Sequence, residues 1–96
     1  MKKVVFVVII EKIYNQEMYA NYISLVVKII QTHNGEYIAR SNKISPLIGI
    51  KPERAIVVAF DSMKEAEECF FSEEYGKIKH LREDSTKSRA FFIEND

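Results

Sequence analysis

The sequence predicts an α+β fold of the ferredoxin-like type, a βαββαβ plait built on a four-stranded antiparallel sheet. Two continuous apolar runs, residues 4–10 and residues 55–60, are typical of strands that are buried on both faces. The elements follow the order strand, helix, strand, strand, helix, strand, which right-handed connections fold into this plait. The first and third strands are central in such a sheet, in agreement with their apolar composition.

The first strand, residues 4–10, is β-branched or aromatic throughout, as a pleated surface prefers. A helix follows, with Asn15 as its candidate N-cap. Asn34 and Gly35 supply a left-handed stop at its other end. Between these signals, side chains that could face a core recur at helical spacing: Tyr19, Tyr22, Ile23, Val26, Ile30 and His33.

Residues 36–41 predict a second strand at an edge of the sheet, because one of its faces is polar. Strict alternation places Arg40 on the same face as Ile38 and opposite Tyr37. Residues 41–53 then form a long connection that carries large aliphatic residues, namely Ile44, Leu47, Ile48 and Ile50. We expect this connection to pack over its own sheet, a partner subunit or the mouth of a pocket.

The second half of the chain supplies a strand, a helical region and a final strand. Ser62 and Glu65 form a capping box that starts a helix directly after residues 55–60. Ser72 is a second cap signal, and Gly76 is expected to mark a break between two helical pieces. Residues 88–94 form the last strand, with its aromatic residues on alternate faces.

Composition limits the partners and the compartment of this 96-residue chain, which is the size of one domain, residues 1–96. Its 14 basic residues balance 14 acidic ones, so no net charge favours nucleic acid or an anionic membrane. The apolar runs are much shorter than the roughly 20 residues of a membrane-spanning helix. Cys69 is the single cysteine and has no intramolecular disulfide partner, which favours the cytoplasm.

The pattern also predicts a homodimer. Two helical regions cover only one face of a four-stranded sheet, yet the two central strands are apolar on both faces. A second copy of the chain is the simplest cover for the other face. We therefore expect two chains to associate through their sheet faces.

The chain resembles a known family over almost its whole length. The resemblance is carried by Tyr19 and Tyr22 and by four segments, residues 32–40, 52–60, 72–75 and 81–89. These are similar to the domain of unknown function 1330 family, within the dimeric α+β barrel superfamily. Asn34 stands where that family usually has glycine, and asparagine also tolerates the left-handed conformation.

This resemblance implies a homodimer whose two sheets face each other, and it implies no established activity. Relatives in the wider superfamily include cofactor-free monooxygenases, muconolactone-type isomerases and haem enzymes. Because one fold serves such different reactions, the fold does not select a function.

Five residues are candidates for a site between the helices and the sheet. His33 is either a proton carrier or a helix-end histidine that bonds the last carbonyls. Arg40 is either a clamp for a carboxylate or an exposed edge charge. Arg82 could reach the same cavity or pair with a nearby acid. Tyr22 and Tyr75 either line a pocket or belong to the core.

Other chemistries lack the residues that they need. His33 and His80 are far apart in the sequence, and no His, Cys, Asp or Glu cluster has metal spacing. The three glycines are isolated, so no phosphate loop is present. No catalytic triad is recognisable. We therefore expect no metal, nucleotide or other cofactor.

Two hypotheses remain. In the first, the protein binds or transforms a small organic anion, and whether it is an enzyme stays open. In the second, it is a non-catalytic dimeric interaction module. A polar, water-accessible cavity near Arg40 favours the first hypothesis, and a completely filled core favours the second.

Overall fold

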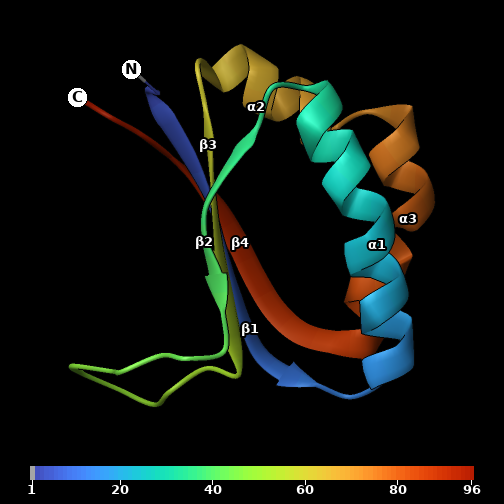
Figure 1. The fold of residues 1–96 in the computed structure, drawn as a ribbon, viewed down its shortest axis with the longest axis vertical. Coiled ribbons are helices and arrows are strands. Elements are labelled where there is room, and N and C mark those ends of the chain that lie inside the picture. Colours follow the sequence, from blue (N-terminus) through green and yellow to red (C-terminus); the bar gives the residue numbers. More distant parts are fainter. Residues whose placement is uncertain (1) are drawn as a thin grey trace.

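The computed structural model describes residues 2–96, in which a four-stranded antiparallel sheet carries its helices on one face (Figure 1). The central strands are β1 (Val4–Ile13) and β3 (Arg54–Phe60), and the edge strands are β2 (Glu36–Ser41) and β4 (Thr86–Glu94). The strand order is β2-β3-β1-β4, with every neighbouring pair antiparallel. The predicted α+β, ferredoxin-like fold class is confirmed.

Three helices are present among the described residues: α1 (Gln16–Thr32), α2 (Met63–Phe70) and α3 (Glu73–Ser85). The expected break at Gly76 is wrong, because Gly76 lies inside α3. The break falls before Ser72, whose hydroxyl accepts a hydrogen bond from the Tyr75 backbone nitrogen at 3.1 Å and so begins α3. No helix within residues 2–96 has the length and apolar character needed to cross a membrane.

The first helix begins and ends where the sequence indicates. Asn15 accepts a hydrogen bond from the Met18 backbone nitrogen at 3.0 Å. At the other end, Asn34 takes the left-handed conformation, with a φ of 63°. Gly35 is needed there for space, since a Cβ atom at this position would lie 2.9 Å from the ring of Phe60.

The core lies between the helices and the sheet. Along β1, alternate side chains from Val4 to Ile10 are buried, and Phe6 stacks on Phe70 of α2 with ring centres 3.9 Å apart. Val5 and Val7 occupy the intervening positions and face the other side of the sheet, which no described helix covers (Figure 1). The sheet therefore has one packed face and one open face.

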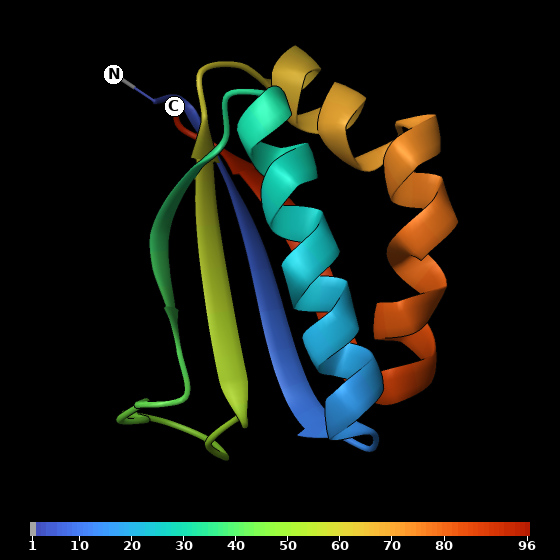
Figure 2. The ribbon, with the colours of Figure 1, turned by 45° about the vertical axis from the view of Figure 1, so that its right-hand side comes forward.

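The connection between β2 and β3, residues 42–53, extends from the end of the sheet toward the side of the open face (Figures 1 and 2). Three of its aliphatic side chains are between 91% and 97% exposed: Leu47, Ile48 and Ile50. They pack neither on the chain's own sheet nor against its helices. We call residues 42–53 the arm.

The N-cap of α2 gives the first testable prediction. The Ser62 hydroxyl accepts a hydrogen bond from the Glu65 backbone nitrogen at 3.2 Å. Replacing Ser62 by alanine (Ser62→Ala) leaves that nitrogen without its acceptor and should lower the free energy of unfolding by about 1 kcal/mol. Chemical denaturation measures this loss. Ser45→Ala, in the exposed arm, is the control and should have no effect, whereas an equal change in both variants would contradict the role of Ser62.

Candidate functional site

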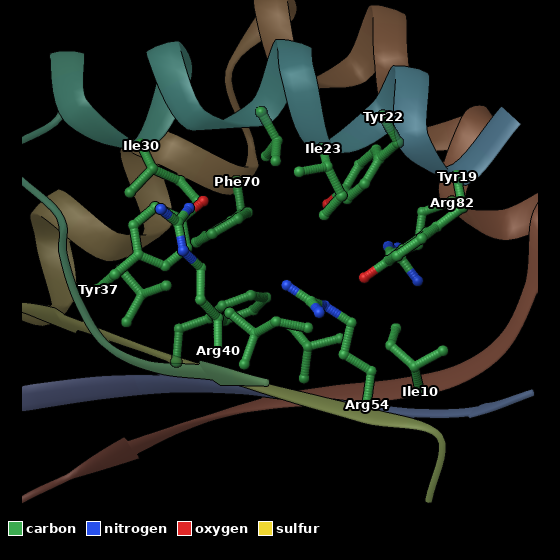
Figure 3. Close-up of a pocket in the computed structure, with 15 residues that line it drawn as sticks. Ile10, Tyr19, Tyr22, Ile23, Ile30, Tyr37, Arg40, Arg54, Phe70 and Arg82 are labelled. Atoms are coloured by element: carbon green, nitrogen blue, oxygen red, sulfur yellow. The ribbon is translucent and has the colours of Figure 1, made fainter. Parts of the chain in front are cut away.

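A cavity of about 30 Å³ lies between α1 and the sheet (Figure 3). Since one water molecule needs about 10–15 Å³, the cavity has room for about two. Its walls are mostly aliphatic side chains and phenylalanines from α1, α2, β1 and β3. Polar groups reach it from six residues: Tyr19, Tyr22, Tyr37, Arg40, Arg54 and Arg82.

A larger hollow of about 430 Å³ adjoins this cavity. Tyr19, Ile23 and Arg54 line both spaces. The hollow opens to the surface beside the start of α1, where Gln16 and Asn42 contribute polar groups. A molecule could therefore place a small charged end in the cavity and a larger body in the hollow.

Arg40 reaches the cavity because β2 contains a bulge. Tyr37 pairs with Val58 of β3, and Ala39 pairs with the adjacent Val57, so Ile38 is an extra residue in β2. The bulge turns Arg40 to the face of Tyr37, and the expectation of strict alternation is wrong at this point. The guanidinium carbon of Arg40 lies 4.3 Å from the centre of the Tyr37 ring, a cation–π contact between two residues that line the cavity.

Arg54 is the first residue of β3 and pairs with Ile10 of β1. Its side chain points from the sheet into the cavity (Figure 3). The Nε atom of Arg54 is buried and has no hydrogen-bond partner among residues 2–96. The sequence interpretation missed Arg54 because it stands at the border of the apolar run. The period of two from Phe60 through Val58 and Ile56 could have placed it on the buried face.

Arg82 is held in place by neutral groups. Its Nε donates to the Tyr75 hydroxyl at 3.3 Å, and its Nη1 donates to the Ser88 hydroxyl at 3.0 Å. The Tyr75 hydroxyl is also hydrogen-bonded to the Tyr22 hydroxyl at 2.8 Å. Burial lowers the pKa of Arg82, but the hydroxyls of Tyr75 and Tyr22 raise it by more, so the guanidinium stays charged.

The tyrosine hydroxyls at the cavity are neutral at physiological pH. Burial raises the pKa of Tyr19, and the nearby Arg54 guanidinium, through its charge and its hydrogen-bond donors, and the charge of Arg82 oppose this only in part. Burial and the neighbouring Tyr75 hydroxyl raise the pKa of Tyr22 much further. The Tyr19 hydroxyl is buried without a hydrogen-bond partner in the described part of the chain. It and the nearby Arg54 thus bring two unused polar atoms to one place.

No carboxylate among the described residues that line the cavity compensates the positive charges of Arg40, Arg54 and Arg82. Asp and Glu are absent from the described residues that line the cavity. The ion pairs found within residues 2–96 join Lys2 to Asp61, and Lys87 and Arg89 to Glu11. None of them includes an arginine of the cavity, so three positive charges surround an apolar space.

The candidate residues from the sequence divide into two groups. The cavity is lined by Tyr22, Arg40 and Arg82. The Tyr75 hydroxyl forms hydrogen bonds with Tyr22 and Arg82 and does not itself line the cavity. His33 does not line it. His33 lies at the C-terminal end of α1 and donates from Nδ1 to the Ile29 carbonyl at 2.9 Å, so the helix-end interpretation fits its position.

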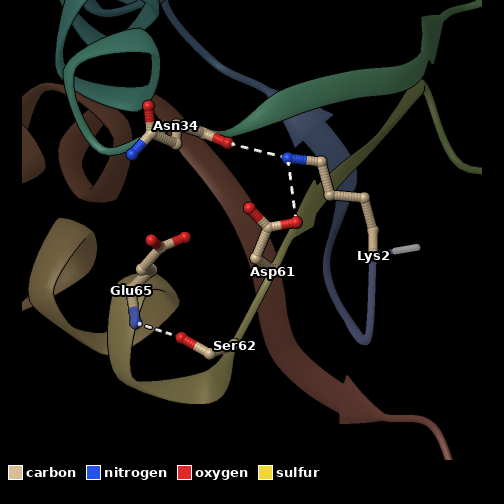
Figure 4. A network of polar contacts seen from close by, with 5 residues as sticks. All are labelled: Lys2, Asn34, Asp61, Ser62 and Glu65. Carbon is tan, nitrogen blue, oxygen red and sulfur yellow. Dashed lines mark hydrogen bonds and ion pairs between the residues drawn. The ribbon is translucent and has the colours of Figure 1, made fainter.

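A second polar cluster lies at the opposite end of β3 (Figure 4). Lys2 Nζ lies 3.5 Å from an Asp61 carboxylate oxygen and donates to the Asn34 carbonyl at 3.2 Å. These contacts connect the start of the chain to the turn after α1. The predicted capping box is half formed, since the Ser62 hydroxyl accepts from the Glu65 backbone nitrogen but no hydrogen bond returns from the Ser62 backbone to the Glu65 carboxylate (Figure 4). Among the same residues, no group of three His, Cys, Asp or Glu could hold a metal ion.

The sequence matches a known protein family over almost its whole length. The family model described as Domain of unknown function (DUF1330) matches residues 4–96. The chain belongs to the DUF1330 family. The family resemblance given by the sequence is thereby confirmed. No curated protein sequence matches this DUF1330 chain.

Solved structures share the fold at low sequence identity. A protein of unknown function from Rhodopseudomonas palustris superposes with a TM-score of 0.78 at 13% identity, covering 100% of this chain and 85% of that one. SnoaB, a cofactor-independent oxygenase from Streptomyces nogalater, superposes with a TM-score of 0.66 at 5% identity, covering 100% of this chain and 95% of SnoaB. A hypothetical protein from Arabidopsis thaliana superposes with a TM-score of 0.67 at 10% identity, covering 100% of this chain and 90% of that one. At these identities the likeness shows the fold alone.

Two tyrosine variants test whether the hydroxyls differ as described. Tyr22→Phe should lower the free energy of unfolding by about 1 kcal/mol, because it removes the hydrogen bond to Tyr75. Tyr19→Phe should leave stability unchanged or raise it, because the Tyr19 hydroxyl has no partner. Chemical denaturation of both variants makes the comparison. An equal loss in Tyr19→Phe would show that its hydroxyl is bonded in the free protein.

Proposed function

We propose that this DUF1330 protein binds a small organic anion in the cavity between α1 and the sheet. One observation carries the proposal: Arg40, Arg54 and Arg82 surround an apolar space and have no carboxylate partner among the described residues. A charge that is partly removed from water is costly unless it is paired. A bound anion supplies the missing negative charge.

Arg54 and Arg82 hold the charged end of the anion in this proposal. A guanidinium donates in a rigid fork that matches the two oxygens of a carboxylate, and such charge-assisted bonds are strong. Within residues 2–96, Arg82 is bonded through Nε and Nη1, which leaves Nη2 for the ligand. Its geometry is therefore set before binding. Arg40 lines the cavity beside Tyr37 and adds a third positive charge.

The available space sets the size of the ligand. A cavity of about 30 Å³ takes a group as small as a carboxylate, and the adjoining hollow of about 430 Å³ takes an organic body. The two ends of the arm, Asn42 and Glu53, line this entrance, whereas the rest of the arm extends toward the side of the open face and does not close it (Figure 2).

Whether the ligand is transformed is a second question. His33 is not in the cavity, so the proposal does not give it the role of proton carrier. The polar groups at the cavity are guanidiniums and phenols rather than metal ligands, and we propose a site that uses neither a metal nor a nucleotide. SnoaB, with the same fold, is a cofactor-independent oxygenase, so cofactor-free chemistry suits this scaffold. We place the protein in the cytoplasm, where Cys69 stays a free thiol.

Thermal shift and titration calorimetry with acetate, propionate, benzoate and 4-methylpentanoate test the binding proposal. A ligand at 100 times its Kd should stabilise the protein by about 2.7 kcal/mol. Arg54→Gln should weaken binding at least about tenfold, since a hydrogen bond to a charged group is lost. Lys64→Gln is the control, because Lys64 is an exposed cation on α2 that lines neither the cavity nor the hollow. If no carboxylate binds the wild-type protein, the proposal is wrong.

The open face of the sheet favours a second proposal, a homodimer, which also keeps the interaction-module hypothesis in view. Val7 lies at the centre of this face, in register with Val57 of β3 and Phe91 of β4. Phe91 and Ile93 are large apolar side chains exposed on the same face. A contiguous apolar surface of this kind marks an interface. In a two-fold dimer the two faces pack together, and each arm lies against the other copy.

Charge at the centre of the open face tests the dimer. Val7→Asp should convert the dimer into a folded monomer, because the carboxylate would be buried unpaired in the interface. Light scattering at micromolar concentration distinguishes the dimer from the 11.2 kDa monomer. Phe6→Asp is the contrasting variant and should unfold the chain, since Phe6 lies in the core. A wild-type protein that is monomeric under these conditions would exclude the dimer.

A further inference from the structure

The polar groups that face the cavity are mainly hydrogen-bond donors: three guanidiniums, which only donate, and three tyrosine hydroxyls, which donate and also accept. Arginine has donors and no acceptor. The hydroxyl of Tyr22 is already engaged with Tyr75. Among the described lining residues there is no carboxylate, amide, imidazole or aliphatic hydroxyl. The cavity therefore matches a group that consists of acceptors.

Two donors in the cavity lack any partner within residues 2–96, Arg54 Nε and the Tyr19 hydroxyl. Their chemistry differs. The charged fork of Arg54 suits an ionised carboxylate. The Tyr19 hydroxyl is neutral and more than nine-tenths buried, and it suits a neutral carbonyl oxygen. It lies close enough to Arg54 for that charge to affect its ionisation.

We propose that the anion is a carboxylate with a neutral carbonyl oxygen beside it and without an ammonium group, the simplest class being 2-oxo acids. Arg54 and Arg82 bind the carboxylate, and Tyr19 donates to the carbonyl. This inference rests on the proposed function and narrows it to a class of ligand.

The same arrangement rejects the corresponding amino acids. An ammonium group on the carbon next to the carboxylate would lie among three guanidiniums, whose positive charges repel it, and only tyrosine hydroxyls could accept its protons. Glu53 lines the outer hollow, but its carboxylate already accepts a hydrogen bond from the Ile13 backbone nitrogen. The ammonium group of an amino acid is one carbon away from its carboxylate. When that carboxylate is held in the cavity, the ammonium group therefore does not reach Glu53 in the outer hollow.

Calorimetric titration of the wild-type protein with acids of matched skeletons tests this inference. One series is 4-methyl-2-oxopentanoate, 4-methylpentanoate and leucine, and a smaller series is pyruvate, propionate and alanine. In the series whose carbon skeleton fits the cavity and the hollow, the oxo acid should bind most tightly. The plain acid should bind about tenfold more weakly, for one lost neutral hydrogen bond. The amino acid should bind at least about 100-fold more weakly.

Tyr19→Phe tests the assignment of the carbonyl to Tyr19. This variant should bind the oxo acid and the plain acid equally, because the donor that distinguishes them is gone. Tyr14→Phe is the control, since Tyr14 is 65% exposed and lies outside the cavity, and it should keep the preference. Circular dichroism checks that both variants are folded.

The outcomes separate this inference from the proposed function. An amino acid that binds as tightly as its oxo acid overturns the inference and leaves anion binding intact. Equal binding of oxo and plain acids by the wild-type protein, or a preference that survives Tyr19→Phe, overturns the role of Tyr19. Binding of acetate or benzoate but of none of these six acids overturns the inference alone, and if no carboxylate of either set binds the wild-type protein, the proposed function fails as well.

Discussion

The constraint on which the site depends is positive charge held in an apolar layer. The packing of α1 on the sheet encloses guanidinium groups from β3 and α3 among aliphatic and aromatic side chains. Hydrophobic packing would be better served by apolar residues at positions 54 and 82, because an unpaired charge gains nothing from burial. A site that binds an anion accepts this loss of stability in the free protein and regains it when the anion is present.

The two inner arginines prepare the site in different ways. Arg82 is fixed by Tyr75, which in turn bonds Tyr22, so a chain of neutral hydrogen bonds connects α3 to α1. Such support holds the guanidinium in one orientation without neutralising it. Arg54 has no comparable support, and its Nε and the Tyr19 hydroxyl stay unbonded within residues 2–96. The cavity thus combines a rigid donor with two donors that a ligand can bring into order.

The sequence predicts the fold well because each element has a local cause. The apolar runs, the caps at Asn15 and Ser62, and the turn at Asn34 depend on neighbouring residues alone. The site depends on effects that are not local. The bulge at Ile38 results from pairing with β3, and it moves Arg40 to the buried face. Arg54 belongs to a strand whose start is set by its register with β1. Residue type and alternation do not reveal the bulge, and alternation places Arg54 on the buried face only once the strand is known to begin at that residue.

The two faces of the central strands connect the two proposals. In β3, Ile56 and Val58 form part of the cavity floor, whereas Val57 between them lies on the open face. In β1, Val7 stands in the same relation to Phe6 and Val8. A partner that packs on Val7 and Val57 therefore restrains the backbone that positions the cavity floor, although it never contacts the ligand. If both proposals are right, affinity for an anion depends on the assembled dimer, and a variant that separates the chains should loosen the site as well.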